Sequence, residues 1–143
     1  MKPIRVLIVD DHALVRHAIR RLLITKPALQ IVGEAGDGQE AICLVKKLLP
    51  DLILMDIVMP PEDGAKTIAA IKRDYPQLKI IAMTTFLDCA KIREALVAGA
   101  DGCLLKDGDG EMFLQAIQTV QRGGKLLHPR FAQQLSRSRL SSL

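Results

Sequence analysis

Residues 4–11 are Ile-Arg-Val-Leu-Ile-Val-Asp-Asp, an aliphatic and largely β-branched run that ends in two carboxylates. Such a run is typical of a buried β-strand. Apolar residues then recur at spacings of three to four through Leu14, Ala18 and Leu22, which predicts an amphipathic helix directly after the strand. The chain therefore opens with a strand and a helix, and the acidic pair lies at the end of the strand.

This pattern of strand and helix occurs five times along the chain. Strands that are apolar on both faces and alternate with amphipathic helices imply a parallel sheet covered by helices on both sides. Right-handed crossovers limit the connections, so the predicted fold class is α/β, a doubly wound five-stranded parallel sheet of flavodoxin-like order 2-1-3-4-5 with five flanking helices. The strands are expected at residues 4–9, 29–35, 52–55, 79–83 and 102–105, and the helices near residues 14–23, 39–48, 68–75, 88–98 and 110–121.

The composition limits the class of protein. At 143 residues, 49% of them hydrophobic, the chain suits one globular domain, and its apolar runs are far shorter than the roughly 20 residues that cross a bilayer. The N-terminus lacks a signal-peptide pattern, so we expect a cytoplasmic protein without a membrane partner. The cysteines are odd in number and have no C-x-x-C spacing, which predicts reduced, mostly packing thiols at Cys43, Cys89 and Cys103.

A basic segment closes the chain. From Arg122 to Leu143 there are five Lys or Arg residues and no Asp or Glu, together with two glycines and four serines. This composition predicts a linker or C-terminal tail at residues 123–143, after a domain at residues 1–122. The net charge of +4 is compatible with a nucleic-acid partner, but with only 3% aromatic residues the charge alone establishes none.

Four of the five predicted strands end in polar residues. Because parallel strands place their carboxyl ends along one edge of a sheet, these side chains should meet there, beside the crevice where the winding reverses. Three carboxylates in a small space repel one another, which favours a hard divalent ion such as Mg²⁺. A lysine adds a compact positive charge and a threonine a hydroxyl donor, so the group suits phosphoryl transfer. Each alone has a simpler role, such as helix capping by the acidic pair, and the prediction depends on their joint placement. The residues are Asp10, Asp11, Asp56, Thr84 and Lys106.

These residues and their spacing resemble a known family. The chain is similar to the receiver domain of bacterial response regulators from about residue 3 to residue 122. Asp11-His12, Leu-Leu-Lys106-Asp107 and a later Gly-Gly pair resemble the NarL/LuxR-type subgroup, whose members usually carry a C-terminal helix-turn-helix DNA-binding domain. The motifs that carry the wider resemblance are Val9-Asp10-Asp11, Met55-Asp56 followed by Met59-Pro60 and Gly64, Thr84, and Gly99-Ala100-Asp101-Gly102 leading to Lys106.

The resemblance implies a role for each residue of the site. Asp56 would accept a phosphoryl group from a sensor histidine kinase and form an acyl phosphate. Asp11, Asp56 and the backbone carbonyl of Val58 would ligate Mg²⁺, and Asp10 would hold it through water. Lys106 would pair with the phosphoryl oxygens and Thr84 would donate a hydrogen bond to one of them. Apart from this self-phosphorylation and its reversal, no enzymatic activity is implied.

The resemblance also implies how the phosphate is used. Phosphorylation would switch a protein interface and promote a homodimer, through helix 1 with helix 5 or through the face of helices 4 and 5. DNA binding would belong to a C-terminal domain absent from this chain, since residues 123–143 are too few for a helix-turn-helix domain. Most relatives have an aromatic switch residue where this chain has Cys103, so we hypothesise that Phe86 carries the signal instead.

Three other interpretations were compared with this one. His12 and His17 beside the acidic pair suggest a transition-metal site, but His12 is expected to begin a helix and both to be solvated helix positions. A haloacid-dehalogenase-like phosphatase also uses a strand-end Asp with Mg²⁺, but that family has Asp-x-Asp after the first strand, and position 12 here is His. A stand-alone receiver without a DNA-binding domain is the third, and a reading frame that ends at Leu143 would favour it.

Overall fold

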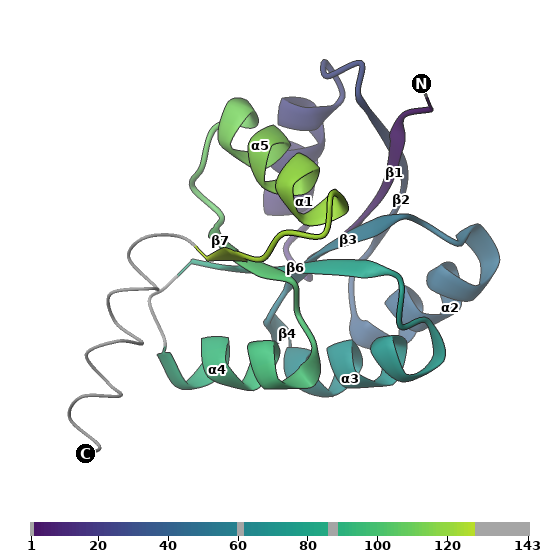
Figure 1. Ribbon diagram of the computed structural model, residues 1–143, viewed down its shortest axis with the longest axis vertical. Helices are drawn as coiled ribbons and strands as arrows, with labels where there is room; N and C mark the ends of the chain where they lie inside the picture. The colour runs from purple at the N-terminus through teal and green to yellow at the C-terminus, as the bar shows by residue number, and fades with distance from the viewer. Residues whose placement is uncertain (1, 60–61, 86–88, 128–143) are drawn as a thin grey trace.

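The predicted sheet is present in the computed structural model, which describes residues 2–59, 62–85 and 89–127 (Figure 1). The parallel strands follow the order β2-β1-β3-β6-β7-β8, so the expected flavodoxin-like order of the first five is confirmed and a sixth strand is added. No helix in these ranges is long and apolar enough to cross a membrane. The strands are β1 (Ile4–Val9), β2 (Leu29–Ala35), β3 (Leu52–Asp56), β6 (Lys79–Thr84), β7 (Gly102–Leu105) and β8 (Leu126–Leu127), and a small antiparallel pair is formed by β4 (Val58–Met59) and β5 (Glu62–Asp63).

Five helices cover the two faces of the sheet, as predicted. Helices α1 and α5 lie on one face and α2, α3 and α4 on the other (Figure 1). Alternate residues of β1 enter the two cores: Val6 and Ile8 pack with α1 and α5, and Leu7 and Val9 with the other three helices. The aliphatic run that opened the sequence is therefore buried on both faces. The helices are α1 (Ala13–Leu23), α2 (Gly38–Leu48), α3 (Gly64–Asp74), α4 (Cys89–Ala98) and α5 (Gly110–Gln121).

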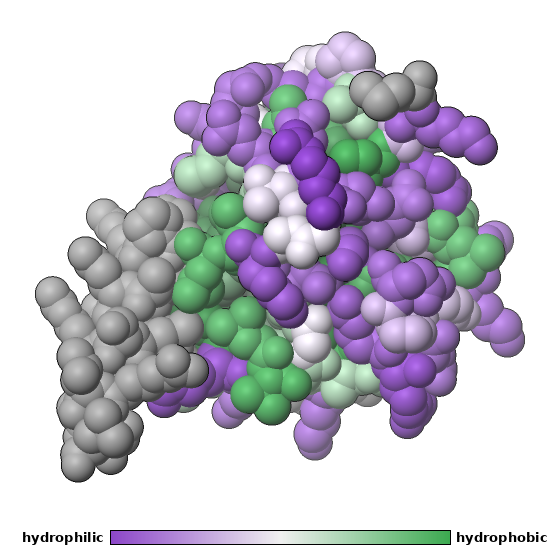
Figure 2. Space-filling model, in the orientation of Figure 1, coloured by the Kyte–Doolittle hydropathy of each residue, from purple (hydrophilic) through white to green (hydrophobic). Residues whose placement is uncertain are grey.

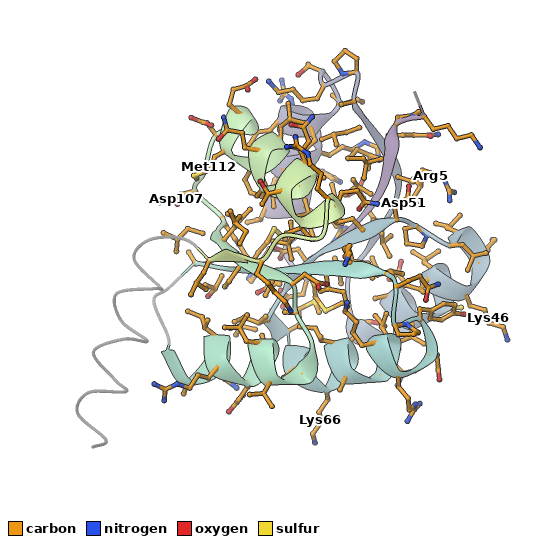
Figure 3. All side chains as sticks on the ribbon, viewed as in Figure 1. Arg5, Lys46, Asp51, Lys66, Asp107 and Met112 are labelled. Atoms are coloured by element: carbon orange, nitrogen blue, oxygen red, sulfur yellow. The ribbon has the colours of Figure 1, made fainter. Side chains whose placement is uncertain are left out.

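The two edges of the sheet differ in the residues that they carry. Arg5 and Asp51 lie at the edge where the strands begin, and Asp107 lies at the opposite edge, where they end (Figure 3). At the first edge, the Arg5 backbone N–H donates to Asp51 Oδ2 at 2.9 Å. On the face shown in Figure 2, hydrophobic side chains gather near β7 and over α4, with smaller groups near α2 and at the top of the view, and polar side chains cover much of the remainder. The predicted site belongs to the edge at which Asp107 lies.

Strand β8 was not predicted, because its residues fall in the segment expected to be a linker. Gly102 pairs with Leu126, and Cys103 with Leu127. A Cβ atom at Gly102 would lie 2.8 Å from the carbonyl oxygen of Leu126, so only glycine admits the new strand at this distance. The first residues after α5 thus extend the sheet. The boundary after residue 122 stays a prediction, and the rest of the tail, including residues 128–143, lies outside the described residues.

The Gly-Ala-Asp-Gly motif has a structural role. Asp101 is buried, and its Oδ2 accepts a hydrogen bond from the Ile80 backbone N–H at 3.0 Å and pairs with Lys72 Nζ at 2.7 Å. These contacts join the turn before β7 to β6 and to α3. Since Lys106 follows β7 directly, this turn also fixes the position of the predicted lysine.

Candidate functional site

Three of the predicted residues meet at the carboxyl edge of the sheet. Asp10 follows β1, Asp56 ends β3 and Lys106 follows β7. Lys106 Nζ lies 2.7 Å from Asp10 Oδ2 and 2.9 Å from Asp56 Oδ2. The two carboxylates are buried, at 0% and 2% exposed. The lysine therefore bridges two carboxylates that lie far apart in the sequence and are almost closed off from water.

Thr84 ends β6, the strand between β3 and β7. It is 1% exposed and pairs with Leu105, the residue before Lys106, while the preceding Met83 pairs with Asp56. The structure thus places Thr84 at the same edge of the sheet as the three charged residues.

Asp11 and His12 add to the acidic group. One ligand atom from each of Asp10, Asp11, His12 and Asp56 lies within 4.8 Å of the others. His12 is the N-cap residue of α1 rather than its first residue, and its backbone N–H donates to Asp10 Oδ1 at 2.9 Å. Its side chain is 67% exposed, as expected for a solvated position, but it precedes the helix instead of beginning it.

The loop after Asp56 is held against the site by backbone contacts. The Val58 N–H donates to Asp56 Oδ1 at 2.9 Å, which places the Val58 backbone beside the carboxylate. The Ile57 N–H donates to the Met83 carbonyl at 3.1 Å. A Cβ atom at Gly64 would lie 2.6 Å from Ile57 Cα, so the glycine in the motif allows α3 to begin directly behind this loop.

The charges of the site are unbalanced. Burial raises the pKa of the Asp56 carboxyl; the Val58 N–H and Lys106 oppose this rise, and the charge of Asp10 adds to it. Burial alone would lower the pKa of the Lys106 ammonium, but hydrogen bonds and charge interactions with Asp10 and Asp56 outweigh it and raise that pKa. Lys106 is therefore firmly protonated, while its single positive charge faces three carboxylates.

The residues fit a hard divalent cation. Apart from its ion pair with Lys106, the fully buried Asp10 Oδ2 has no hydrogen-bond partner among the described residues. A cation between Asp10, Asp11 and Asp56 would compensate the excess of negative charge and supply this oxygen with a partner, directly or through water. Carboxylate oxygens in this number suit an ion that takes one or two of them and keeps several waters.

Comparison with known proteins agrees with this geometry. The sequence profile of the response regulator receiver domain matches residues 6–118. The chain is 35% identical over 132 residues to the transcriptional regulatory protein DegU of Brevibacillus brevis, covering 92% of this chain and 56% of DegU. A two-component response regulator of the LuxR family from Aurantimonas sp. SI85-9A1 superposes with a TM-score of 0.90 at 31% identity, covering 97% of this chain and 99% of that one. A structure of two RcsB dimers bound to two parallel DNAs gives a TM-score of 0.85 at 30% identity, covering 94% and 69%.

The chain belongs to the response regulator receiver domains, the regulatory phosphoacceptor domains of two-component systems. Its relatives place it with the NarL/LuxR type within that family. The chain spans little more than half the length of DegU, one of the curated relatives that it matches.

The remaining sequence predictions had mixed outcomes. Cys103 is fully buried in β7, and burial raises the pKa of its thiol to about 12, so its packing role is confirmed. Cys43 is exposed on α2, which corrects its assignment as a packing thiol: it lies on the outer face of the helix, opposite buried Ala41 and Val45. Phe86, the hypothesised switch residue, lies outside the described residues, as does the side chain of Cys89.

Proposed function

We propose that Asp56 accepts a phosphoryl group from a sensor histidine kinase in a Mg²⁺-dependent reaction. The observation that supports this best is the position of Lys106 Nζ, 2.7 Å from Asp10 Oδ2 and 2.9 Å from Asp56 Oδ2, beside the excess negative charge of the site. A carboxylate flanked by a fixed cation and by ligands for a metal ion is equipped for phosphoryl transfer, in which positioning and charge neutralisation supply most of the catalysis.

The chain's own residues divide the work as follows. An Asp56 carboxylate oxygen attacks the phosphorus of the kinase's phosphohistidine, the P–N bond breaks, and the imidazole leaves with its electron pair. Lys106 releases part of its ion pair with Asp56 and neutralises phosphoryl oxygens, and the Thr84 hydroxyl donates to another of them. Asp11, Asp56 and the Val58 carbonyl would hold Mg²⁺, with Asp10 acting through water. When bound, the ion supplies further charge neutralisation on the transferring group.

Self-phosphorylation and its reversal belong to the same proposal. A small phosphoryl donor reaching Asp56 would meet the same residues as the kinase's phosphohistidine, and hydrolysis of the acyl phosphate would restore the carboxylate.

The phosphate would act by changing an interface. It adds up to two negative charges and new acceptor oxygens beside Lys106 and Thr84, which shifts the loop after β6 and the faces next to it. We propose that this promotes a homodimer and controls a C-terminal helix-turn-helix DNA-binding domain beyond residue 143. The RcsB dimers bound to DNA and the span of just over half of DegU support this view. A cytoplasmic location is supported by the free thiols of Cys43 and Cys103.

The phosphoacceptor is tested by mass spectrometry after incubation with acetyl phosphate or phosphoramidate and Mg²⁺. One phosphoryl group, labile to acid and base, should appear on the chain and be absent from the Asp56→Asn variant. Asp107→Asn is the matched control, because Asp107 is an exposed carboxylate at the same edge of the sheet. An adduct that survives Asp56→Asn, or no adduct in the unmodified chain, contradicts the proposal.

A further inference from the structure

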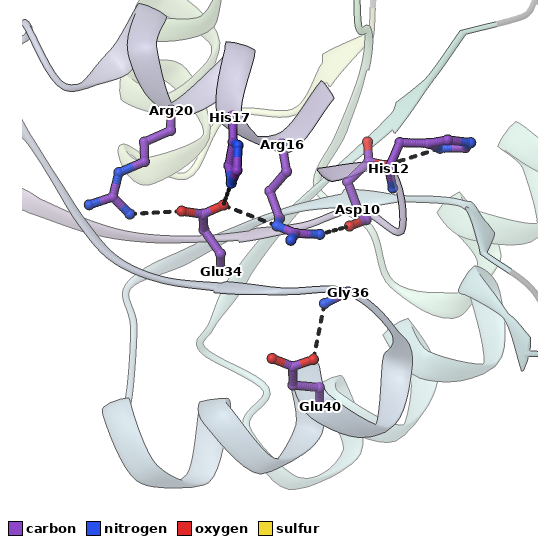
Figure 4. A network of polar contacts seen from close by, with 8 residues as sticks. All are labelled: Asp10, His12, Arg16, His17, Arg20, Glu34, Gly36 and Glu40. Carbon is purple, nitrogen blue, oxygen red and sulfur yellow. Dashed lines mark hydrogen bonds and ion pairs between the residues drawn. The ribbon is translucent and has the colours of Figure 1, made fainter. Parts of the chain in front are cut away.

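His12 lies between the acidic pair and helix α1, in a backbone conformation that directs it to the site. Its φ and ψ of −96° and 106° are extended, and its N–H donates to Asp10 Oδ1 at 2.9 Å, so the residue turns over the carboxyl end of β1. Five residues later, His17 has a different neighbour: its Nε2 lies 3.9 Å from Glu34 Oε1 of β2. Figure 4 shows His12 at Asp10 and His17 directed at Glu34. The two histidines that the sequence grouped together are separate.

The imidazole of His12 has the spacing of a metal ligand. Its Nδ1 lies 3.0 Å from Asp11 Oδ1 and 3.4 Å from Asp10 Oδ1. Two adjacent ligand atoms on an octahedral ion, each about 2.1 Å from the metal, lie about 3.0 Å apart. The separation of His12 Nδ1 and Asp11 Oδ1 therefore suits two neighbouring ligands of one ion, and Asp10 and Asp56 offer further ligand atoms within 4.8 Å.

His12 has no competing polar partner among the described residues. Its ring contacts only the carboxylates of Asp10 and Asp11, and its side chain is 67% exposed. By contrast, Lys106 pairs with carboxylate oxygens on the buried side of the cluster, with its side chain 8% exposed. The ring thus covers the solvent side of the acidic cluster, where a bound ion would otherwise carry water.

We propose that His12 is a further ligand of this site and gives it a preference for first-row transition-metal cations over Mg²⁺. The inference rests on the proposed phosphoacceptor function, since it concerns the same ion. Mg²⁺ favours carboxylate, carbonyl and water oxygens, whereas imidazole suits later ions such as Co²⁺, Ni²⁺ and Zn²⁺. A site of oxygen ligands alone discriminates little in favour of the later ions, and one imidazole nitrogen replacing a water increases that discrimination.

The competing explanation is an ion pair between a protonated His12 ring and Asp11. Removal of such a cation would strengthen the binding of Mg²⁺ and Co²⁺ alike, because both ions would no longer compete with its charge. Removal of a ligating ring would instead weaken the binding of Co²⁺ and leave that of Mg²⁺ nearly unchanged. The two explanations therefore differ in the ratio of the two affinities.

The test is calorimetric titration of the chain with CoCl₂ and, separately, with MgCl₂, for the unmodified chain and for His12→Ala. We expect Co²⁺ affinity to fall about tenfold or more in His12→Ala, as for loss of a metal-ligand contact, while Mg²⁺ affinity changes less than about twofold. The visible absorption of bound Co²⁺ should also change, because a nitrogen ligand is lost. His17→Ala is the matched control and should leave both affinities unchanged. Asp11→Asn should lower the affinity for both ions.

Three results overturn the inference: equal changes for the two ions in His12→Ala, no change for either, or no Co²⁺ binding by the unmodified chain. Phosphorylation by acetyl phosphate with Mg²⁺, measured on the same samples, separates this failure from that of the proposed function. If the phosphoryl adduct forms on Asp56 but His12→Ala does not change the preference between the two ions, only the role of His12 is contradicted. Absence of that adduct contradicts the phosphoacceptor assignment, whatever affinities are measured for Co²⁺ and Mg²⁺.

Discussion

Replacing the phosphoacceptor Asp56 by Asn should make the metal-free protein more stable. The reason lies in the charges around the carboxylate. With an effective dielectric constant of about 20, the attraction of Lys106 Nζ at 2.9 Å is about 6 kcal/mol. Asp10 and Asp11, with ligand atoms within 4.8 Å, each repel it by about 3.5 kcal/mol. The charge interactions nearly cancel, and the cost of burying an ionised carboxylate remains.

Asn removes that cost and keeps the shape of the site, although its NH2 group cannot accept from Lys106. Its amide oxygen can still accept from the Val58 N–H, and Lys106 retains Asp10 Oδ2 at 2.7 Å. We expect Asp56→Asn to raise the free energy of unfolding at pH 7 by about 1–2 kcal/mol. For a domain of this size, the melting temperature should rise by about 3–6 °C. Asp107→Asn, at an exposed carboxylate, should change stability by less than about 0.5 kcal/mol.

The sign of the pH dependence follows from the same carboxyl group. Because burial raises the folded-state pKa of Asp56 above the ordinary carboxyl value of 3.8, its stabilising contribution is present below that value and is lost as pH rises through the folded-state pKa. The advantage of Asp56→Asn should therefore be smallest at low pH, grow as the pH rises through the folded-state pKa of Asp56, and then level off. An advantage that shrank as the pH rose would contradict the assigned direction.

Addition of Mg²⁺ should reverse the order of stabilities. An ion that binds only the folded state stabilises it by about 2.7 kcal/mol at a concentration of 100 times its Kd. The unmodified chain should gain this increment, and Asp56→Asn should gain less because it lacks one ligand. Urea or thermal unfolding monitored by far-UV circular dichroism, with EDTA and then with saturating Mg²⁺, measures both effects. A less stable Asp56→Asn in EDTA, or equal gains from Mg²⁺, would refute the reasoning.

Three further predictions concern the rest of the sheet edge. Lys106→Met leaves two buried carboxylates without their cation, so urea unfolding at pH 7 should show that the free energy of unfolding falls by about 3 kcal/mol. The yield of the acetyl phosphate adduct should also fall sharply, and an unchanged yield would count against the role of Lys106. Gly102→Ala brings a Cβ atom to 2.8 Å from the Leu126 carbonyl oxygen, so it should lower the free energy of unfolding by about 1–3 kcal/mol. Amide hydrogen exchange should become faster at Leu126, whose N–H donates to the Asp101 carbonyl at 3.2 Å. Unchanged exchange there would mean that β8 tolerates the methyl group. A thiol reagent should modify exposed Cys43 rapidly and Cys103 only on unfolding, since burial raises the pKa of the Cys103 thiol to about 12; equal rates in the native protein would show that β7 opens readily.

The site could be predicted from the sequence because its residues follow from the sheet. Each charged residue comes at the end of a strongly apolar run, and the order of parallel strands determines which runs adjoin. This is why Asp56 and Lys106, separated by 50 positions, were expected to meet, and Lys106 Nζ lies 2.9 Å from Asp56 Oδ2. Topology and hydrophobic pattern suffice for contacts of this kind, since they depend on strand ends rather than on side-chain torsions.

The features that were missed depend on shorter signals. Strand β8 has two residues, too few for any periodicity, and it exists because Gly102 lacks a side chain. The direction of His12 depends on an extended N-cap conformation, which spacing along a helix does not predict. Cys43 lies on the outer face of helix α2, whereas Cys103 lies in strand β7, all of whose residues are buried. These are local geometries, and each needs the structure.

Strand β7 joins the chemistry of the site to the segment that continues the chain. Its carboxyl end leads into Lys106, which contacts the carboxylate of Asp56, while its first two residues pair with β8. Cys103 is the second of these residues: it pairs with Leu127 on one side and with Ala82 of β6 on the other. Cys103 is fully buried, and its small side chain packs within a continuous sheet. We therefore expect a change at Lys106 to reach residues 126–127 most directly through the backbone of β7 and its pairing with β8.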